Sequence, residues 1–284
     1  MKQNKITKFF NGTNALRLST FAGGALLLIS MAACKGPSQS KIEKKHAKYV
    51  SKMPDAKLQQ GDHSGNAEKL ANLITWEMAA DIDSLINGLT TPEQKYNLRE
   101  MYCNTAVTNA VRDALNKTNF QELYGFDFFA QAKLPEFQGG ARFLKYLQSN
   151  QEAYDAAATT IKFSELTEGD YDKMSCGSIV FYRGTYVNPN TRKKTRPYSH
   201  TQMVGGKGFS DDVKGQENGL NPGGTKFMPS PKGETITINA YSNLFRYGGD
   251  NIDVYNRRND VVLDEVVVVN TKKYLEVLMK QKSK

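Results

Sequence analysis

Ser178–Val187 reads SIVFYRGTYV, and at this stretch the sequence changes from a helical pattern to a strand pattern. Most of its residues are β-branched or aromatic, which are the types that strands favour. A helical pattern returns only at 271–281, near the end of the chain. Asn, Pro and Gly separate the stretch from four similar runs, at 198–206, 234–242, 251–256 and 261–269. The C-terminal part is therefore predicted to form a β-sheet followed by one helix.

The chain before this stretch has helical periodicity. Apolar residues fall on one stripe over 67–88 and on a second stripe over 106–115. Two shorter stretches, 141–148 and 152–161, also have a helical pattern. Helices first and a mostly antiparallel sheet afterwards indicate an α+β fold, with the N-terminal helices packed on the sheet.

Residues 1–33 have the composition of a secretory leader. Four basic residues and no acid are followed by an apolar stretch that ends at Cys34. The stretch is shorter than the roughly 20 apolar residues that a membrane-spanning helix needs. A cysteine directly after Met-Ala-Ala resembles a bacterial lipobox, which implies that Cys34 is lipidated and anchors the chain to an envelope membrane. An ordinary signal peptide cut nearby is the alternative.

The segment after the leader, 34–66, is polar, charged and poor in large apolar residues, so we expect a lipidated N-terminus and a flexible tether. Residues 67–284 then form one domain of ordinary size. The leader holds four of the 38 basic residues and none of the 29 acidic ones, which leaves a mild excess of 34 over 29. That balance suits an anionic cell envelope and gives no indication of nucleic-acid binding.

Two thiols remain beyond Cys34. Cys103 lies on the apolar stripe of the helix that contains 106–115. If a helix begins at Asn104 or Thr105, Cys103 stands at its N-terminus, where the dipole and free N–H groups would lower the pKa of the thiol. If the helix instead runs unbroken from Pro92, Cys103 is an inert core residue. The sequence leaves both interpretations open.

The chain has three histidines, and His46 and His63 fall in the expected tether. His200 lies in the strand 198–206, where it shares a face with Gln202 and Val204. On a sheet face that packs against the helix, His200 could meet the thiol of Cys103 and act as its base. The next strand offers Asn239, whose side chain could orient the imidazole.

These residues resemble the NlpC-type and CHAP papain-like cysteine hydrolases. The turn that opens the first strand of those proteins stands here as SCGSIVF (Ser175–Phe181), and their histidine strand stands as HTQMVGG (His200–Gly206). The resemblance covers roughly 95–245. It implies a papain-like fold and an enzyme that cleaves amide bonds in peptidoglycan stem peptides without a cofactor. It also implies that Cys103 is the nucleophile, that His200 is the base and that Asn239 orients the imidazole.

Some positions depart from the pattern of those families. Ser178 stands where they have an Asp, Cys176 where a Pro is common, and Asn104-Thr105 where a small or polar pair follows the nucleophile. Tyr96 and Tyr102 are candidates for a donor to the oxyanion.

Three alternatives stay open. A Cys103–Cys176 disulfide would make the protein a non-catalytic envelope lipoprotein that binds cell wall or a partner protein. A cysteine transferase or a peptidase for protein substrates would use the same residues. Zinc binding by the two cysteines and His200 lacks any supporting spacing.

Two loops complete the sequence-based expectations. Arg192–Arg196 is expected at the solvated tip of a hairpin, and Gly248–Asn251 as a turn between strands. The Gly- and Asn-rich stretch 207–230 is expected to be a long loop beside the histidine strand.

Overall fold

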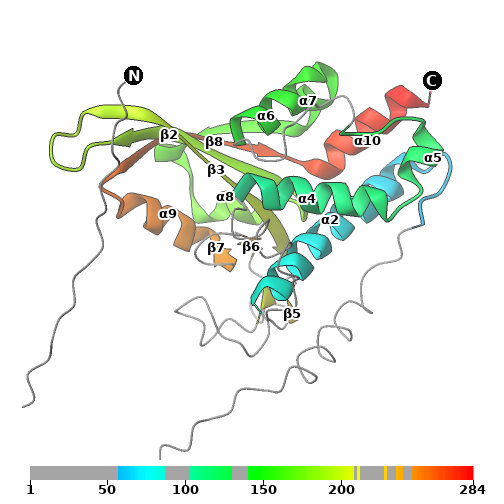
Figure 1. Ribbon diagram of the computed structural model, residues 1–284, viewed down its shortest axis with the longest axis horizontal. Coiled ribbons are helices and arrows are strands. Elements are labelled where there is room, and N and C mark those ends of the chain that lie inside the picture. The colour runs from blue at the N-terminus through cyan, green and yellow to red at the C-terminus, as the bar shows by residue number, and fades with distance from the viewer. Residues whose placement is uncertain are drawn as a thin grey trace, which may run out of the picture. The chain divides into compact units, whose positions relative to one another are not determined.

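The computed structural model describes residues 57–86, 103–129, 140–207, 210–211, 227–228, 235–238 and 245–283. Side chains are described over these ranges except at 79–86, at Gly140 and from Gly206 to Tyr247. Helices and one six-stranded sheet make up the structure, so the predicted α+β class is confirmed (Figure 1).

Every strand pair of the sheet is antiparallel, and the strand order is β1-β8-β2-β3-β6-β7. The centre consists of β8 (Val261–Val269), β2 (Ile179–Val187) and β3 (Lys194–Lys207). The edges are β1 (Ala158–Lys162) on one side, and β6 (Thr235–Ile238) and β7 (Phe245–Tyr247) on the other. Two short strands, β4 (Ser210–Asp211) and β5 (Phe227–Met228), pair with each other separately.

One face of the sheet packs against most of the helices. These are α2 (His63–Ile86), α4 (Cys103–Asn116), α5 (Phe120–Tyr124), α6 (Gly140–Ser149), α7 (Gln151–Ala157) and α10 (Thr271–Lys282). In β2 and β3 the residues that point to this face are Ile179, Phe181 and Met203, and they share a hydrophobic core with helix residues such as Ile74 and Val107. We call this the helical face.

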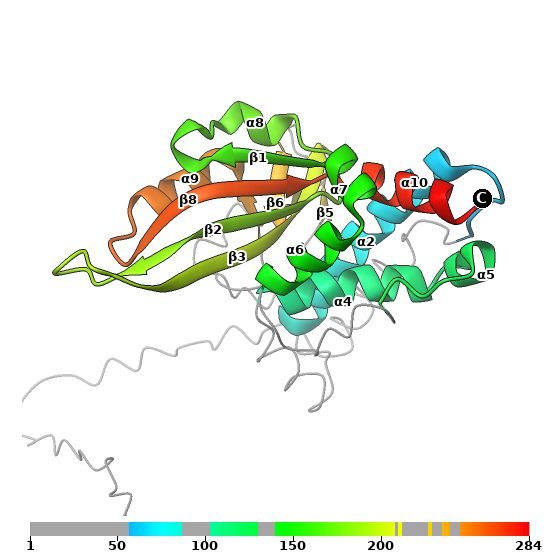
Figure 2. The ribbon, with the colours of Figure 1, turned by 90° about the horizontal axis from the view of Figure 1, so that it is seen from above.

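The opposite face has a smaller cover. It consists of η1 (Phe163–Glu165), α8 (Glu168–Asp172) and α9 (Gly248–Asn256), and Figure 2 shows α8 and α9 across the strands from α2 and α4. Its core contains Val180, Tyr182, Val204 and Val266, together with Tyr171 and Tyr255 from the two helices. We call this the tyrosine face.

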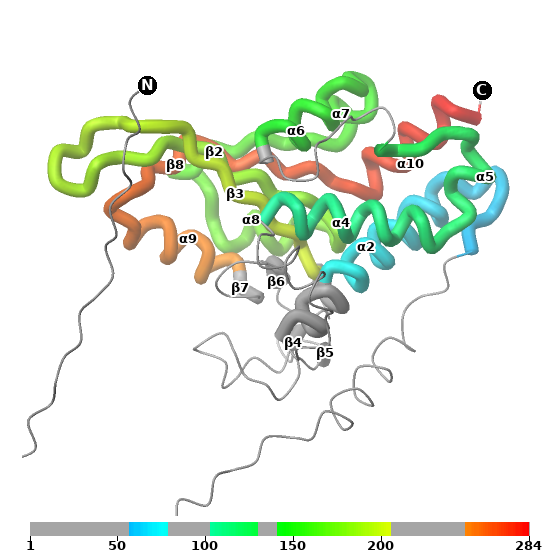
Figure 3. The backbone as a smooth tube through the Cα atoms, in the orientation of Figure 1, coloured from blue at the N-terminus to red at the C-terminus, as the bar shows by residue number. Residues whose placement is uncertain are grey.

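Both faces of β2 are buried over 179–182, and both faces of β8 are buried over 266–269, which explains why these two segments read as continuous apolar runs. The strands predicted at 178–187, 198–206 and 261–269 and the helix at 271–281 are confirmed. β3 also reaches back to Lys194, so only the first part of Arg192–Arg196 lies in the hairpin turn, with Arg192 at a φ of 56°. The hairpin of β2 and β3 projects beyond the other strands (Figure 3).

Two predicted elements were wrong. The run 251–256 is not a strand but the end of α9, and Gly248–Asn251 is the first turn of that helix. The residues that α9 buries are Gly248, Asn251 and Tyr255, which is a spacing of three and four rather than two. Gly248 also lies so close to Tyr171 that a Cβ would come within 2.8 Å of its ring, which allows α9 to pack directly on this residue.

The second error concerns 152–161, which divides into α7 and β1 at Ala158. The alanines at 156–158 fit a helix, but the β-branched residues after them pair with β8 in the register Thr159↔Val268 and Ile161↔Val266. Tertiary pairing therefore determines the end of the helix.

The predicted boundary between tether and domain, at residue 66, lies too late in the sequence. Leu58 is 2% exposed and belongs to the helical core, and its N–H donates to the Asn119 side chain at 2.8 Å. Asn66 is buried and donates to the Tyr124 hydroxyl, while the His63 ring lies 5.9 Å from the Tyr124 ring. Residues 57–66 are thus part of the folded domain, because the buried Leu58 side chain and these polar contacts attach them to it.

Candidate functional site

Cys103 is the first described residue of α4. Its sulfur accepts a hydrogen bond from the backbone N–H of Thr201, at an N–S distance of 3.4 Å. Backbone N–H groups lie in the plane of a sheet and point either to one neighbouring strand or to the other. Since β2 occupies one side of β3 at Thr201, the sulfur lies at the other side of β3.

Among the described strands, that side of β3 has a pairing partner over only part of its length. β6 pairs with β3 from Met203 to Lys207, and among the described strands residues 198–202 pair only with β2. The N-terminus of α4 therefore contacts β3 at Thr201, two residues before Met203, the partner of the last described residue of β6. This arrangement brings the thiol to the backbone of the histidine strand.

His200 is the residue that precedes this hydrogen bond. Because the N–H of Thr201 belongs to the His200–Thr201 peptide, standard bond lengths place the sulfur within about 6 Å of the His200 Cα. The His200 ring lies beside Tyr182, with ring centroids 6.0 Å apart. Tyr182 points to the tyrosine face, and so does His200, its direct partner in the β2–β3 register.

The position of His200 differs from the prediction. His200 was expected on the face that packs against the helices, but Thr201 and Met203 occupy that face of β3. The Cys103 sulfur contacts the backbone of β3 next to His200, while the His200 side chain lies on the tyrosine face.

The pKa of Cys103 is raised, not lowered as expected for a helix N-terminus. Hydrogen bonds from the N–H groups of Thr201, Asn104 and Cys103 itself favour the thiolate, but burial disfavours it more strongly. The helix-start environment is present, and desolvation outweighs it. Cys103 is accordingly a neutral thiol at neutral pH in this structure.

Cys176 is also a free thiol and has its own partners. Its sulfur donates to the Gly205 carbonyl at 3.2 Å and lies 3.3 Å from the Thr75 hydroxyl. Gly205 is four residues beyond Thr201 on β3, which corresponds to about 13 Å at the usual rise of a strand. Two contacts of this length cannot bridge that separation, so a Cys103–Cys176 disulfide is not compatible with the observed positions.

Four buried tyrosines lie on the same face of the sheet as His200, and we call them the tyrosine cluster: Tyr171, Tyr182, Tyr198 and Tyr255. Tyr198 and His200 are alternate residues of β3, while Tyr182 and Tyr255 have ring centroids 4.9 Å apart. The sequence analysis did not identify the cluster. The alternation of Tyr198, His200 and Gln202 was visible in the sequence, but Tyr255 was assigned to a strand.

The predicted turn before β2 is present. Gly177 has a φ of 76°, and a Cβ there would come within 2.5 Å of the Ala71 carbonyl oxygen, so both the conformation and the space require glycine. Ser178, the next residue, is completely buried. An unpaired carboxylate would be costly at this position.

Four predicted site residues lie outside the described residues: Cys34, Tyr96, Tyr102 and Asn239. The described part of β6 ends at Ile238, whose partner in β3 is Met203. No group of three or more His, Cys, Asp or Glu side chains within the described ranges is placed to hold a metal ion. None of the described helices is long and apolar enough to cross a membrane.

Comparisons with known proteins identify no relative of this chain. No protein-family model, no curated protein and no solved structure matches it.

Proposed function

We propose that this protein is an envelope-anchored, papain-like cysteine hydrolase that cleaves amide bonds in peptidoglycan stem peptides. The observation that carries the proposal is the position of the Cys103 sulfur, at the start of α4 and in contact with the peptide N–H next to His200. Nucleophilic catalysis by cysteine needs this combination of a thiol at a helix N-terminus and a histidine within reach.

The resting thiol is neutral, so the reaction begins with a proton transfer. His200 takes the proton of Cys103 as the sulfur attacks the substrate carbonyl, and a C–S bond forms. The C–N bond of the tetrahedral intermediate then breaks, and His200 returns the proton to the leaving amine. Water hydrolyses the thioester in the second half of the reaction and restores the thiol.

The N–H of Thr201 stabilises the sulfur as its charge develops. A backbone donor in the sheet has a fixed direction, and its contribution to the thiolate is already present before substrate binds. Asn239 is proposed to orient the imidazole from the strand that follows.

The leader and Cys34 support an envelope location. In this proposal the lipid on Cys34 attaches the protein to a bacterial envelope membrane, and the partner of the catalytic domain is peptidoglycan or its peptide fragments. The mildly basic mature chain is compatible with that anionic surrounding.

Mass spectrometry of digested peptidoglycan tests the proposal. The wild-type protein is expected to release fragments with cut stem peptides, and Cys103→Ala is expected to release none above background. His200→Ala should reduce the rate by at least about 1,000-fold, since base and nucleophile act as a unit. Cys176→Ser is the matched control, because it changes the other partly buried thiol and should retain activity.

Identical digests from the wild type and Cys103→Ala would contradict the hydrolase. The raised pKa of Cys103 would then fit the second candidate, a non-catalytic envelope lipoprotein that binds cell wall or a partner protein. If the protein cleaves a protein substrate but not peptidoglycan, the proposed mechanism stands and the proposed substrate is wrong.

A further inference from the structure

The hydroxyl groups of Tyr198 and Tyr255 form a hydrogen-bonded pair, with their oxygens 3.1 Å apart. Both side chains are 8% exposed, and the rings come from different elements, β3 and α9. One hydroxyl donates its proton to the other, and the accepting hydroxyl keeps a proton of its own. Within the described part of the chain this second proton has no acceptor, so the pair has one hydrogen-bond donor to spare.

A second pair in the same cluster behaves differently. Tyr171 and Tyr182 have hydroxyl oxygens 2.6 Å apart, and Tyr182 donates onward to the Gln202 side chain at 2.9 Å. Tyr171 must therefore donate to Tyr182, and both protons of this pair are in use. Only the Tyr198–Tyr255 pair can serve a ligand without breaking a bond inside the cluster.

The position of the spare donor follows from β3. Tyr198 is two residues from His200 and on the same face, and Cys103 contacts the backbone one residue beyond His200. Burial raises the pKa of both Tyr198 and Tyr255, and the charge of a Cys103 thiolate is close enough to raise them further. Both hydroxyls therefore stay protonated and can donate throughout the neutral range.

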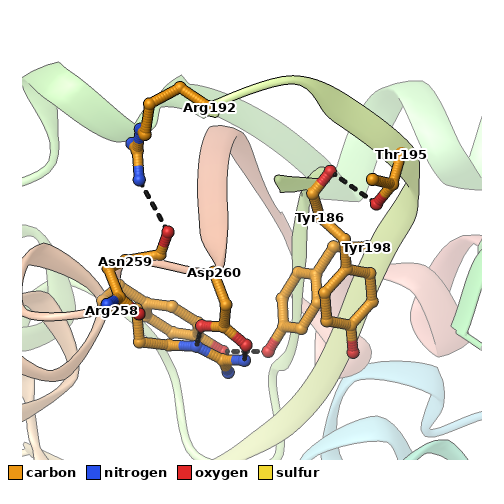
Figure 4. Close-up of polar contacts among 8 residues, drawn as sticks. Tyr186, Arg192, Thr195, Tyr198, Arg258, Asn259 and Asp260 are labelled. Atoms are coloured by element: carbon orange, nitrogen blue, oxygen red, sulfur yellow. Dashed lines mark hydrogen bonds and ion pairs between the residues drawn. The ribbon is translucent and has the colours of Figure 1, made fainter. Parts of the chain in front are cut away.

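The surroundings hold the pair in place. The guanidinium of Arg258 lies 5.3 Å from the centre of the Tyr198 ring and is fixed by two hydrogen bonds to the Asp260 carboxylate, at 2.9 and 2.8 Å (Figure 4). The rings of Tyr198 and Tyr186 also pack in a T-shaped arrangement, with centroids 5.1 Å apart. A donor fixed in this way needs little reorganisation when charge develops nearby.

We infer that the Tyr198–Tyr255 hydroxyl pair donates a hydrogen bond to the oxyanion that forms when Cys103 adds to a substrate carbonyl. The inference rests on the proposed function and assigns the second oxyanion donor of the same site. It makes Tyr198 and Tyr255 catalytic residues that sequence patterns around Cys103 do not reveal.

An aldehyde tests the inference without a need for turnover. With N-acetyl-L-alaninal, the Cys103 sulfur forms a C–S bond to the carbonyl carbon, the π electrons move to oxygen, and His200 takes and keeps the thiol proton, so the adduct carries an oxyanion beside an imidazolium. The readout is protection of Cys103 against iodoacetamide, followed by mass spectrometry of the Cys103 peptide in the full mature protein. Alkylation by iodoacetamide forms no oxyanion, so its rate without aldehyde measures the thiol alone.

Tyr198→Phe and Tyr255→Phe are each expected to weaken aldehyde protection by about 100-fold, the usual effect of one lost oxyanion donor, while the alkylation rate without aldehyde stays unchanged. Tyr171→Phe is the matched control, because it also removes one hydroxyl from a buried tyrosine pair. It should leave aldehyde protection unaffected.

Three results would overturn the inference: undiminished protection in both Phe variants, an equal loss in Tyr171→Phe, or no protection of the wild type. The proposed function fails separately. If protection depends on the two tyrosines but peptidoglycan is not cut, the oxyanion donor is supported and the proposed substrate is wrong.

Discussion

Thr201 donates its backbone N–H to the sulfur of Cys103 although the two residues are 98 positions apart in the chain. This contact joins the first residue of α4 to the edge of β3, and it fixes the thiol beside the peptide of His200. It also means that the reactivity of Cys103 depends on two opposed influences, the donors around the sulfur and the burial of the sulfur.

The alkylation of Cys103 should depend on pH as that of a thiol with a raised pKa. Burial favours the neutral form, so the midpoint of the iodoacetamide rate is expected at a higher pH than for glutathione measured beside it. Cys103→Ala removes the signal from the Cys103 peptide and serves as the control. A fast reaction at pH 6 to 7 would instead indicate a preformed thiolate–imidazolium pair.

The same shift has a consequence for stability. The unfolded chain loses the proton of Cys103 at a lower pH than the folded protein does. The contribution of this residue to folding is therefore complete below the unfolded pKa and is lost as the pH rises towards the folded one. Urea unfolding at neutral and alkaline pH should show a larger loss of stability for the wild type than for Cys103→Ala.

Cys176 should act independently of Cys103. Their sulfurs contact β3 at Gly205 and Thr201, and these sites are too far apart for a disulfide. Mass spectrometry of the non-reduced, folded protein is expected to find no peptide that links the two cysteines. A linked pair in active material would disprove the assigned role of Cys103.

The central strands could be predicted from the sequence because their pattern is strong. β2 over 179–182 and β8 over 266–269 consist of β-branched or aromatic residues that are buried on both faces. The helix α9 could not be predicted from the sequence. The apolar residues of 251–256 fit the period of two of a strand as well as the three-to-four spacing of a helix. Only packing against Tyr171 and the core around Tyr255 decides between them.

Part of the candidate site could likewise be predicted from the sequence, and part could not. The pairing of Cys103 with the His200 strand follows from residue types and chain order, and the start of α4 is a local signal. The face on which His200 lies depends on which side of β3 the helices pack, and a period of two cannot distinguish the two sides. The raised pKa of Cys103 reflects burial by distant residues, which no local pattern contains.

Leu58 should contribute to the stability of the domain although it precedes the predicted boundary. Leu58→Ala is expected to cost about 3 kcal/mol of unfolding free energy, as for other buried leucines. Gln60→Ala, at an exposed position two residues later, is the control and should change little. Limited proteolysis should likewise stop near residue 57, and a fragment that starts at 67 with full stability would contradict this interpretation.

Gly177 offers the sharpest test of the fold around the site. Its φ of 76° is unfavourable for other residues, and an alanine Cβ would also come within 2.5 Å of the Ala71 carbonyl oxygen on α2. Gly61 separates these two effects, since its φ is 81° but no heavy atom lies within 4 Å of a Cβ placed there. Gly61→Ala should therefore cost only the conformational term, about 1 kcal/mol. Gly177→Ala should cost about 3 kcal/mol or more, because α2 and the start of β2 must also move apart. Urea unfolding of the two variants measures the difference, and equal losses would mean that α2 does not pack against this turn.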